Sequence, residues 1–334
     1  MKLKKVLAFT VAMAMGIGMF GNVFVFADEL VTEEVFEPEM EENVVKAPVA
    51  NEEIIAMMEE AEASGTIVIG SADNTIESLQ ARAADTPGSW EQISATKWKW
   101  EYPDGSYAKN AWICVSNQYY YIGADEYMKF GWMLVDGEYY YGSPSGAIYM
   151  NCRKQLSGKN CGFNPSGHLV DLECLVEAVH QAKNNWCWAA CAEMVGTYGV
   201  ASPYNQYHIV NEIKGVPGNL YPDVGAEIEE QKRAIEFASV NSKTASAYSE
   251  FISLSSALDE LVKNQPFKIG ITYVENLTRH AMVVYGLDRN SYEDMLKFVD
   301  PAYLEGSNKM MATYSFIKEN NTYITGNTIK ATLK

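Results

Sequence analysis

The sequence is poor in basic residues, in histidine and, beyond its first part, in long apolar runs. Lys and Arg number 26 against 43 Asp and Glu, and the resulting net charge of −17 argues against a nucleic acid partner. Only four histidines occur, and none is clustered with cysteines, so neither a zinc site nor any other metal or cofactor is expected. After residue 27, no segment is long and apolar enough to span a membrane.

The first 27 residues have the pattern of a secretory signal peptide, with an uncleaved membrane anchor as the alternative. Three lysines precede an apolar stretch over residues 6–20, and Val25 and Ala27 are small residues before a cleavage point. Residues 28–90 follow as an expected acidic spacer or pro-segment, because 13 acidic residues stand against one Lys between positions 28 and 62. We therefore expect a secreted protein.

Residues 91–170 carry an internal repeat with a period near twenty. Trp112 is matched by Trp132, and the tyrosines 119–121 are matched by 139–141. A third, degenerate copy follows and has lost its aromatics. Each copy has strand-forming residues between turn signals, which predicts a small β-hairpin. Since one such hairpin cannot bury its face alone, the copies are expected to stack as a short solenoid.

This pattern resembles the cell-wall-binding, choline-binding-type repeats of Gram-positive surface proteins. The motif GWMLVDGEYYY at 131–141, followed by SGAI at 145–148, carries the resemblance. It implies aromatic cages or grooves that hold choline or glycan on electron-rich ring faces, and hence association with a cell-wall polymer. The alternative is that the aromatics only fill the hairpin core. The candidate ligand-binding residues are Trp112, Tyr119, Trp132 and Tyr139.

Cys187 is the candidate nucleophile of the C-terminal part, residues 171–334. A turn-prone polar run precedes it and helix formers follow over 187–198, so the residue is expected at a helix N-terminus, which favours a thiolate. Gln181, six residues upstream, could donate a hydrogen bond to an oxyanion beside the sulfur. The alternative is an ordinary buried core cysteine, which is how we interpret Cys191.

His280 and Asp300 are the candidate partners of this cysteine. His280 begins an apolar strand, where its ring would lie at the edge of the core. A hairpin centred near residue 290 or 291 would place Asp300 beside it, so that the carboxylate could orient the imidazole. Asp288 is the rival carboxylate. Helices are expected over 202–213, 224–238 and 253–263, and strands over 267–274, 280–288, 295–300 and 323–333.

These residues carry a second resemblance. The motifs QAKNNWCWAAC at 181–191, RHAMVVYG at 279–286 and KFVDP at 297–301 occur in the order found in papain-like cysteine peptidases. They are closest to the compact bacterial branch that includes bacteriocin-leader-processing peptidases and AvrRpt2-type proteases. The resemblance, over about 172–320, implies an α+β fold with a helical half and an antiparallel β half, preceded by the hairpin solenoid. It implies Cys187 as nucleophile, His280 as general base and acid, Asp300 as orienting carboxylate and Gln181 as oxyanion donor.

The expected protein is thus an exported, surface-associated cysteine peptidase that hydrolyses a peptide or protein substrate. Its repeats would attach it to the wall of a Gram-positive bacterium. A peptidoglycan amidase or a transglutaminase-like acyltransferase would use the same Cys-His-Asp chemistry. A non-catalytic wall-binding protein is the alternative of a different class.

Overall fold

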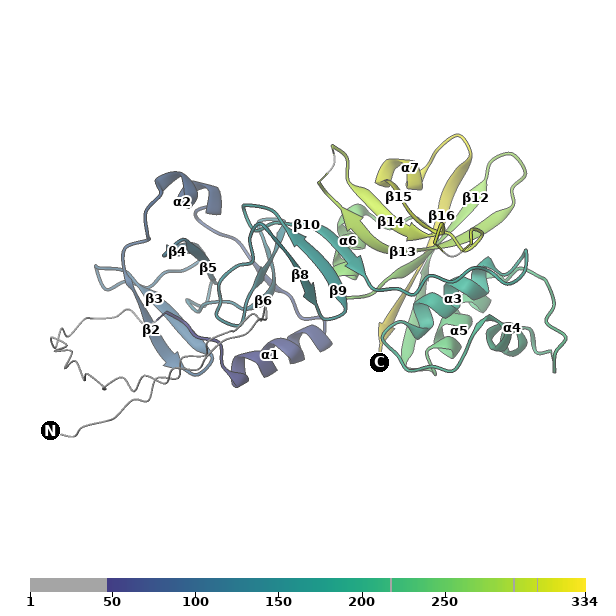
Figure 1. Ribbon diagram of the computed structural model, residues 1–334, viewed down its shortest axis with the longest axis horizontal. Helices are drawn as coiled ribbons and strands as arrows, with labels where there is room; N and C mark the ends of the chain where they lie inside the picture. Colours follow the sequence, from purple (N-terminus) through teal and green to yellow (C-terminus); the bar gives the residue numbers. More distant parts are fainter. Residues whose placement is uncertain (1–46, 217, 291, 305) are drawn as a thin grey trace, which may run out of the picture. The chain divides into compact units, whose positions relative to one another are not determined.

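A computed structural model describes residues 47–216, 218–290, 292–304 and 306–334 (Figure 1). The expected signal peptide and residues 28–46 lie outside these ranges. The helices are α1 (Glu52–Ala63), α2 (Ile76–Arg82), α3 (Cys187–Thr197), α4 (Gln206–Lys214), α5 (Ile228–Ala238), α6 (Leu254–Val262) and α7 (Tyr314–Lys318). The N-terminal strands are β1 (Val68–Gly70), β2 (Ser89–Ser94), β3 (Lys97–Glu101), β4 (Ala111–Val115), β5 (Gln118–Ile122), β6 (Gly131–Val135), β7 (Glu138–Gly142), β8 (Cys152–Leu156) and β9 (Lys159–Phe163). The remaining strands are β10 (Leu169–Cys174), β11 (Lys243–Tyr248), β12 (Phe267–Tyr273), β13 (Arg279–Asp288), β14 (Met295–Val299), β15 (Lys309–Thr313) and β16 (Tyr323–Leu333).

The repeats fold as hairpins with one shared register. In β4–β5 Trp112 pairs with Tyr121, and in β6–β7 Trp132 pairs with Tyr141, twenty residues further along. The turn of the second hairpin places Asp136 and Gly137 at φ of 52° and 86°, which is the left-handed backbone of a tight two-residue turn. A further hairpin, β2–β3, precedes these two.

Over the residues that the structure describes, the expected acidic spacer or pro-segment is folded and packs against the hairpins. Ile54 and Met58 of α1 are buried in the main core, and β1 pairs with β6. α2 buries Ile76 and Leu79 in a second cluster that includes Trp112. The physical reason is that the hairpins leave aromatic surface uncovered, and burying that surface stabilises the segment that covers it.

The third repeat copy does not end where the next domain was expected to begin. Its hairpin β8–β9 continues through β10 into a sheet of nine strands, counted over the described residues. In that sheet β10 pairs with β9 on one side and with β13 on the other. The expected boundary between residues 170 and 171 therefore falls inside β10, and the third copy belongs to the C-terminal sheet.

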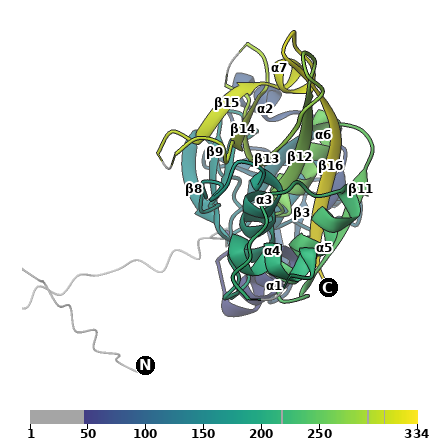
Figure 2. The ribbon, with the colours of Figure 1, turned by 90° about the vertical axis from the view of Figure 1, so that its right-hand side faces the viewer.

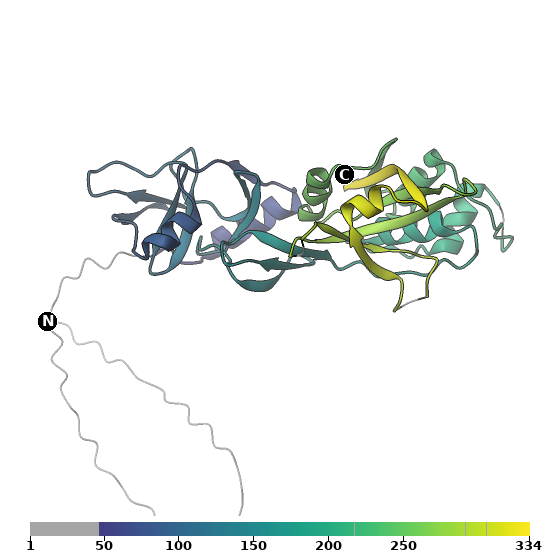
Figure 3. The ribbon, with the colours of Figure 1, turned by 90° about the horizontal axis from the view of Figure 1, so that it is seen from above.

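α3, α4 and α5 pack together beside this sheet, with α3 against β13 (Figures 2 and 3). α4 begins at Gln206 rather than near Ser202, because the Asn205 side chain accepts a hydrogen bond from the His208 amide and caps the helix there. α5 begins at Ile228, four residues later than expected. This mixture of helices and a largely antiparallel sheet is the α+β class that was expected.

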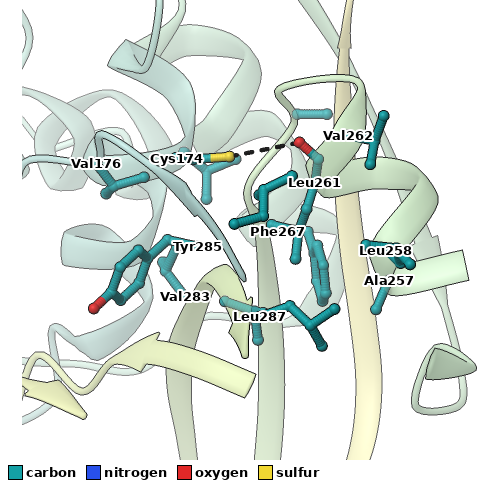
Figure 4. Close-up of a cluster of buried hydrophobic side chains, with 14 of the residues drawn as sticks. Cys174, Val176, Ala257, Leu258, Leu261, Val262, Phe267, Val283, Tyr285 and Leu287 are labelled. Carbon is teal, nitrogen blue, oxygen red and sulfur yellow. Dashed lines mark hydrogen bonds between the residues drawn. The ribbon is translucent and has the colours of Figure 1, made fainter. Parts of the chain in front are cut away.

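Part of the same core joins β10 to α6 (Figure 4). Cys174, at the end of β10, points its thiol towards the Leu261 carbonyl at 3.8 Å, beside Phe267 of β12. Burial raises the pKa of Cys174 to about 12, so this cysteine is a core residue. All six cysteines lie in the described ranges and are free.

A bulge in β13 controls the register with β14. Gly286 pairs with Lys297, whereas Val284 pairs with Phe298, so β13 accommodates one extra residue, Tyr285. Continued by one pair beyond Val299, this register sets Asp300 opposite Met282, on the same face of the sheet as His280. Without the extra residue Asp300 would lie opposite Val283 and point to the other face, because side chains alternate along a strand.

We expect Gly286→Ala to destabilise the bulge. A Cβ atom at Gly286 would lie 2.5 Å from the Leu172 carbonyl oxygen in β10, too close for both backbones to keep their places. Overpacking of this kind costs about 1–3 kcal/mol of unfolding free energy, which chemical denaturation can measure. Gly326→Ala in β16 is the matched control, since a Cβ there meets nothing within 4 Å. Equal stability of the two variants would contradict the tight contact.

Candidate active site

Cys187 is the first residue of α3, as expected, and is half-buried. The preceding residue, Trp186, provides no side-chain hydrogen bond to the helix end, so the first N–H groups of α3 have no side-chain cap. One turn later Cys191 is fully buried, and burial raises its pKa well above the ordinary range. The two cysteines of this helix therefore have different surroundings, and only Cys187 lies at the N-terminal end without a side-chain cap.

His280 and Asp300 form a close hydrogen-bonded pair. The distance from His280 Nε2 to Asp300 Oδ1 is 2.6 Å, and the two side chains are only 10% and 12% exposed. Asp300 Oδ1 also accepts from the Ala302 amide at 3.0 Å, which fixes the carboxylate. Because Nε2 faces Asp300, Nδ1 is the ring nitrogen left for Cys187. The rival Asp288 pairs with Met295 at the far end of the hairpin and accepts from the Asn290 amide.

The electrostatics of the pair favour a charged imidazole. Burial opposes protonation of His280, but the hydrogen bond with Asp300 and the nearby Cys187 outweigh it and raise the pKa to about 9. The raised pKa of His280 favours the imidazolium form. A cation beside a cysteine is the surrounding in which thiol nucleophiles occur.

Gln181 is tied to this site through its backbone. Its amide N–H donates to the Pro301 carbonyl at 2.8 Å, one residue after Asp300. Its side-chain Nε2 donates to the carbonyls of Lys183 and Asn184 at 3.0 and 2.8 Å, so both amide hydrogens are engaged in the residue's own turn. An oxyanion would have to displace one of these two acceptors.

Sequence reasoning missed how the residues around Cys187 hold the loop before α5. The indole of Trp186 donates to the Pro222 carbonyl at 2.9 Å, and that of Trp188 donates to the Val224 carbonyl at 3.0 Å. Asn185 adds a backbone bond to Asp223 at 2.8 Å. Two tryptophans on either side of a cysteine, in a segment otherwise rich in small residues, were the available signal.

The four candidate ligand-binding aromatics lie away from this site and are buried. Trp112, Tyr119, Trp132 and Tyr139 are 2%, 4%, 4% and 3% exposed. Trp112 packs on Tyr140, and the Tyr139 hydroxyl donates to Asp259. Trp112, Trp132 and Tyr139 pack within the hairpin core, whereas Tyr119 also lines a cavity beside α2.

Within the described ranges, no cluster of three or more His, Cys, Asp or Glu side chains is arranged to hold a metal ion. The helices found there are too short or too polar to cross a membrane.

Residues 167–321 match the family described as Papain-like cysteine protease AvrRpt2. The match spans somewhat less than half of the chain and includes Gln181, Cys187, His280 and Asp300. It confirms the expected family resemblance, fold class and enzyme class. A search of curated proteins found no match.

Solved structures resemble the N-terminal part of the chain. Choline binding protein F from Streptococcus pneumoniae is 25% identical over 25% of this chain and 28% of its own, with a TM-score of 0.23. The choline binding domain of Spr1274 from the same species is 32% identical over 26% of this chain and 98% of its own, with a TM-score of 0.22. A truncated alternansucrase from Leuconostoc mesenteroides is 19% identical, covers 29% and 8%, and has a TM-score of 0.23. The chain thus spans less than a third of choline binding protein F, and TM-scores this low say nothing about what its hairpins bind.

We expect peptidase activity to fall as pH rises through about 9, where His280 loses its proton. The pKa of His280 is raised above its ordinary value. The imidazolium is therefore fully present at low pH and is lost as pH rises through that pKa. Asp300→Asn should move this alkaline limb to lower pH, because the hydrogen bond to the carboxylate supports the imidazolium.

The pH profile of kcat/KM on one peptide, for wild type, Asp300→Asn and Asp300→Ala, tests this. Asp300→Ala should lose rate within the roughly 10²–10⁴-fold range of general acid–base assistance, and Asp300→Asn should lose less. Asp288→Ala is the control and should match wild type. An unmoved alkaline limb in Asp300→Asn would show that another group titrates there.

Proposed function

We propose that this chain is an exported cysteine peptidase that cleaves peptide bonds with Cys187 as nucleophile, His280 as acid and base, and Asp300 as the orienting carboxylate. The observation that supports it most directly is the 2.6 Å bond from His280 Nε2 to Asp300 Oδ1, which leaves Nδ1 for the cysteine at the start of α3. The assignment of export rests on the signal-peptide pattern of residues 1–27.

The reaction that this geometry supports has two halves. The Cys187 thiolate attacks the carbonyl carbon, and the oxyanion lies at the first N–H groups of α3 and the Gln181 amide. His280 then gives its proton to the leaving amine, and an acyl-enzyme thioester remains. Neutral His280 takes a proton from water, whose oxygen attacks the thioester, and the acid product leaves as the thiolate and imidazolium are restored. Asp300 keeps the ring oriented throughout.

We further propose that the hairpin region attaches the enzyme to a cell-wall polymer, choline-substituted or glycan. The repeat pattern supports a binding role, while the burial of Trp112 and Trp132 directs attention to another surface. A cavity of about 890 Å³ lies among α2, the β4–β5 turn and the segment before β8. Tyr149 lines it, half-exposed, stacked on Tyr141 at 5.6 Å and covered by the Lys154 ammonium at 5.0 Å. A ring at the wall of a polar cavity suits a sugar, while a cationic headgroup would have to displace the Lys154 ammonium from the Tyr149 ring.

The catalytic assignment predicts that Cys187→Ala abolishes hydrolysis and labelling by a thiol-reactive probe. Cys191→Ala should retain at least partial activity, because that thiol is fully buried one turn away. The measurement is the cleavage rate of a peptide library, with circular dichroism to confirm folding. Equal loss in both folded variants would contradict the choice of nucleophile, and transfer of the acyl group to added amines in preference to water would identify an acyltransferase.

The attachment proposal predicts that Tyr149→Ala weakens retention of the secreted chain on purified Gram-positive cell walls. The experiment uses the full chain with Cys187→Ala, so that cleavage does not alter the walls. Tyr292→Ala is the matched control, since Tyr292 is fully exposed on the turn between β13 and β14. Competition by choline or by glycan fragments then identifies the ligand. A protein that stays in the supernatant with every wall preparation contradicts attachment.

A further inference from the structure

The backbone around Gln181 lies outside every strand. β10 ends at Cys174, and the segment from there to α3 has no neighbouring strand to pair with. Backbone N–H and C=O groups near a protein core still need partners. Here the partners are side chains and single carbonyls, so the position of Gln181 depends on a few individual hydrogen bonds.

Gln206 provides two of these contacts, one on each side of Gln181. Its Oε1 accepts from the Ala182 amide and its Nε2 donates to the His180 carbonyl, both at 2.9 Å. One primary amide thus satisfies the residue before and the residue after Gln181, in the way that a neighbouring strand would. The Gln206 side chain is buried, with 5% of the residue exposed, so water does not compete for these bonds.

Gln206 is itself held from two directions. Its backbone amide donates to Glu193 Oε2 at 2.9 Å, and Glu193 lies on α3, the helix that begins with Cys187. It is also the first residue of α4, directly after the Asn205 cap, which fixes where its side chain starts. The chain of contacts therefore runs from the nucleophile helix through Glu193 and Gln206 to both peptide groups that flank Gln181.

We infer that Gln206 is a positioning residue, which holds the backbone of Gln181 so that its amide can reach the oxyanion. The inference rests on the proposed function and specifies a residue that acts through Gln181 without touching the substrate. Only glutamine fits the role at this length. Methionine of similar shape has neither the donor nor the acceptor, and ionised glutamate keeps the acceptor for Ala182 but loses the donor for His180.

The test is a double-mutant cycle of Gln206→Met and Gln181→Ala, with kcat and KM measured on one peptide substrate. Loss of an oxyanion donor costs roughly 10²–10³-fold in kcat, so we expect that loss for Gln181→Ala and about a tenfold loss for Gln206→Met, with little change in KM. In the Gln181→Ala background, Gln206→Met should cost nothing further, because it acts only through that side chain.

Two variants keep the test decisive if Gln206→Met does not fold. Gln206→Glu has the same length, and its rate relative to wild type should recover as pH falls, since a protonated carboxyl again donates to the His180 carbonyl. Gln231→Met is the matched control. Gln231, on α5, donates its Nε2 to the Ala226 carbonyl at 2.8 Å, and this variant should keep wild-type kcat.

Additive losses in the cycle, or a wild-type kcat in both Gln206 variants, would overturn the positioning role. A wild-type kcat in Gln181→Ala would overturn it as well, since nothing would then need positioning. In each of these cases the proposed peptidase still stands, because the comparison of Cys187→Ala with Cys191→Ala and the acyl-transfer assay test it separately.

Discussion

The hydrogen bond between His280 and Asp300 depends on the register between β13 and β14, because a shift by one residue would turn Asp300 to the other face of the sheet. β14 ends just before Asp300, and the extra residue Tyr285 in β13 decides which face that aspartate shares. The bulge needs Gly286, because the Leu172 carbonyl of β10 occupies the space that a Cβ would take. β10 in turn enters the sheet through the hairpin β8–β9. The degenerate third repeat thus lacks the aromatics of a stacking hairpin and instead pairs with β10 as part of the C-terminal sheet.

The site also joins the helical half to the β half. Gln181 receives its backbone acceptor from Pro301, beside Asp300, while its neighbours are held by Gln206 of α4. A buried charge is costly unless it is paired and hydrogen-bonded, and His280 meets both conditions through Asp300. The same contacts therefore align the proposed catalytic groups and make the burial of an imidazolium tolerable.

What the sequence predicted well was local and periodic. The twenty-residue repeat predicted the hairpins, and the polar turn before Cys187 predicted the helix start. Counting residues from the expected turn predicted that His280 and Asp300 are neighbours. The turn lies later than expected, and the extra residue in β13 compensates for that shift. Such a bulge depends on β10, far away in sequence. Ser202 and Asn205 are equally good caps by type, and only the His208 contact selects Asn205. The helix over residues 51–63 could be predicted from the sequence, but its packing against the hairpins could not.

The hairpin region is joined to the turn between β13 and β14. Arg289, one residue beyond β13, binds Glu138 of β7 at 2.8 Å, and its backbone amide donates to the Val170 carbonyl at 2.7 Å. Lys159 of β9 is buried and caps the end of α6 by donating to the Val262 carbonyl at 2.6 Å. One carbonyl of α6 and the turn between β13 and β14 thus have hydrogen-bond or ion-pair partners in the hairpin region. We expect a truncation that removes residues up to 163 to leave this helix end uncapped and the turn without its Glu138 partner, and so to lower the stability of the catalytic part.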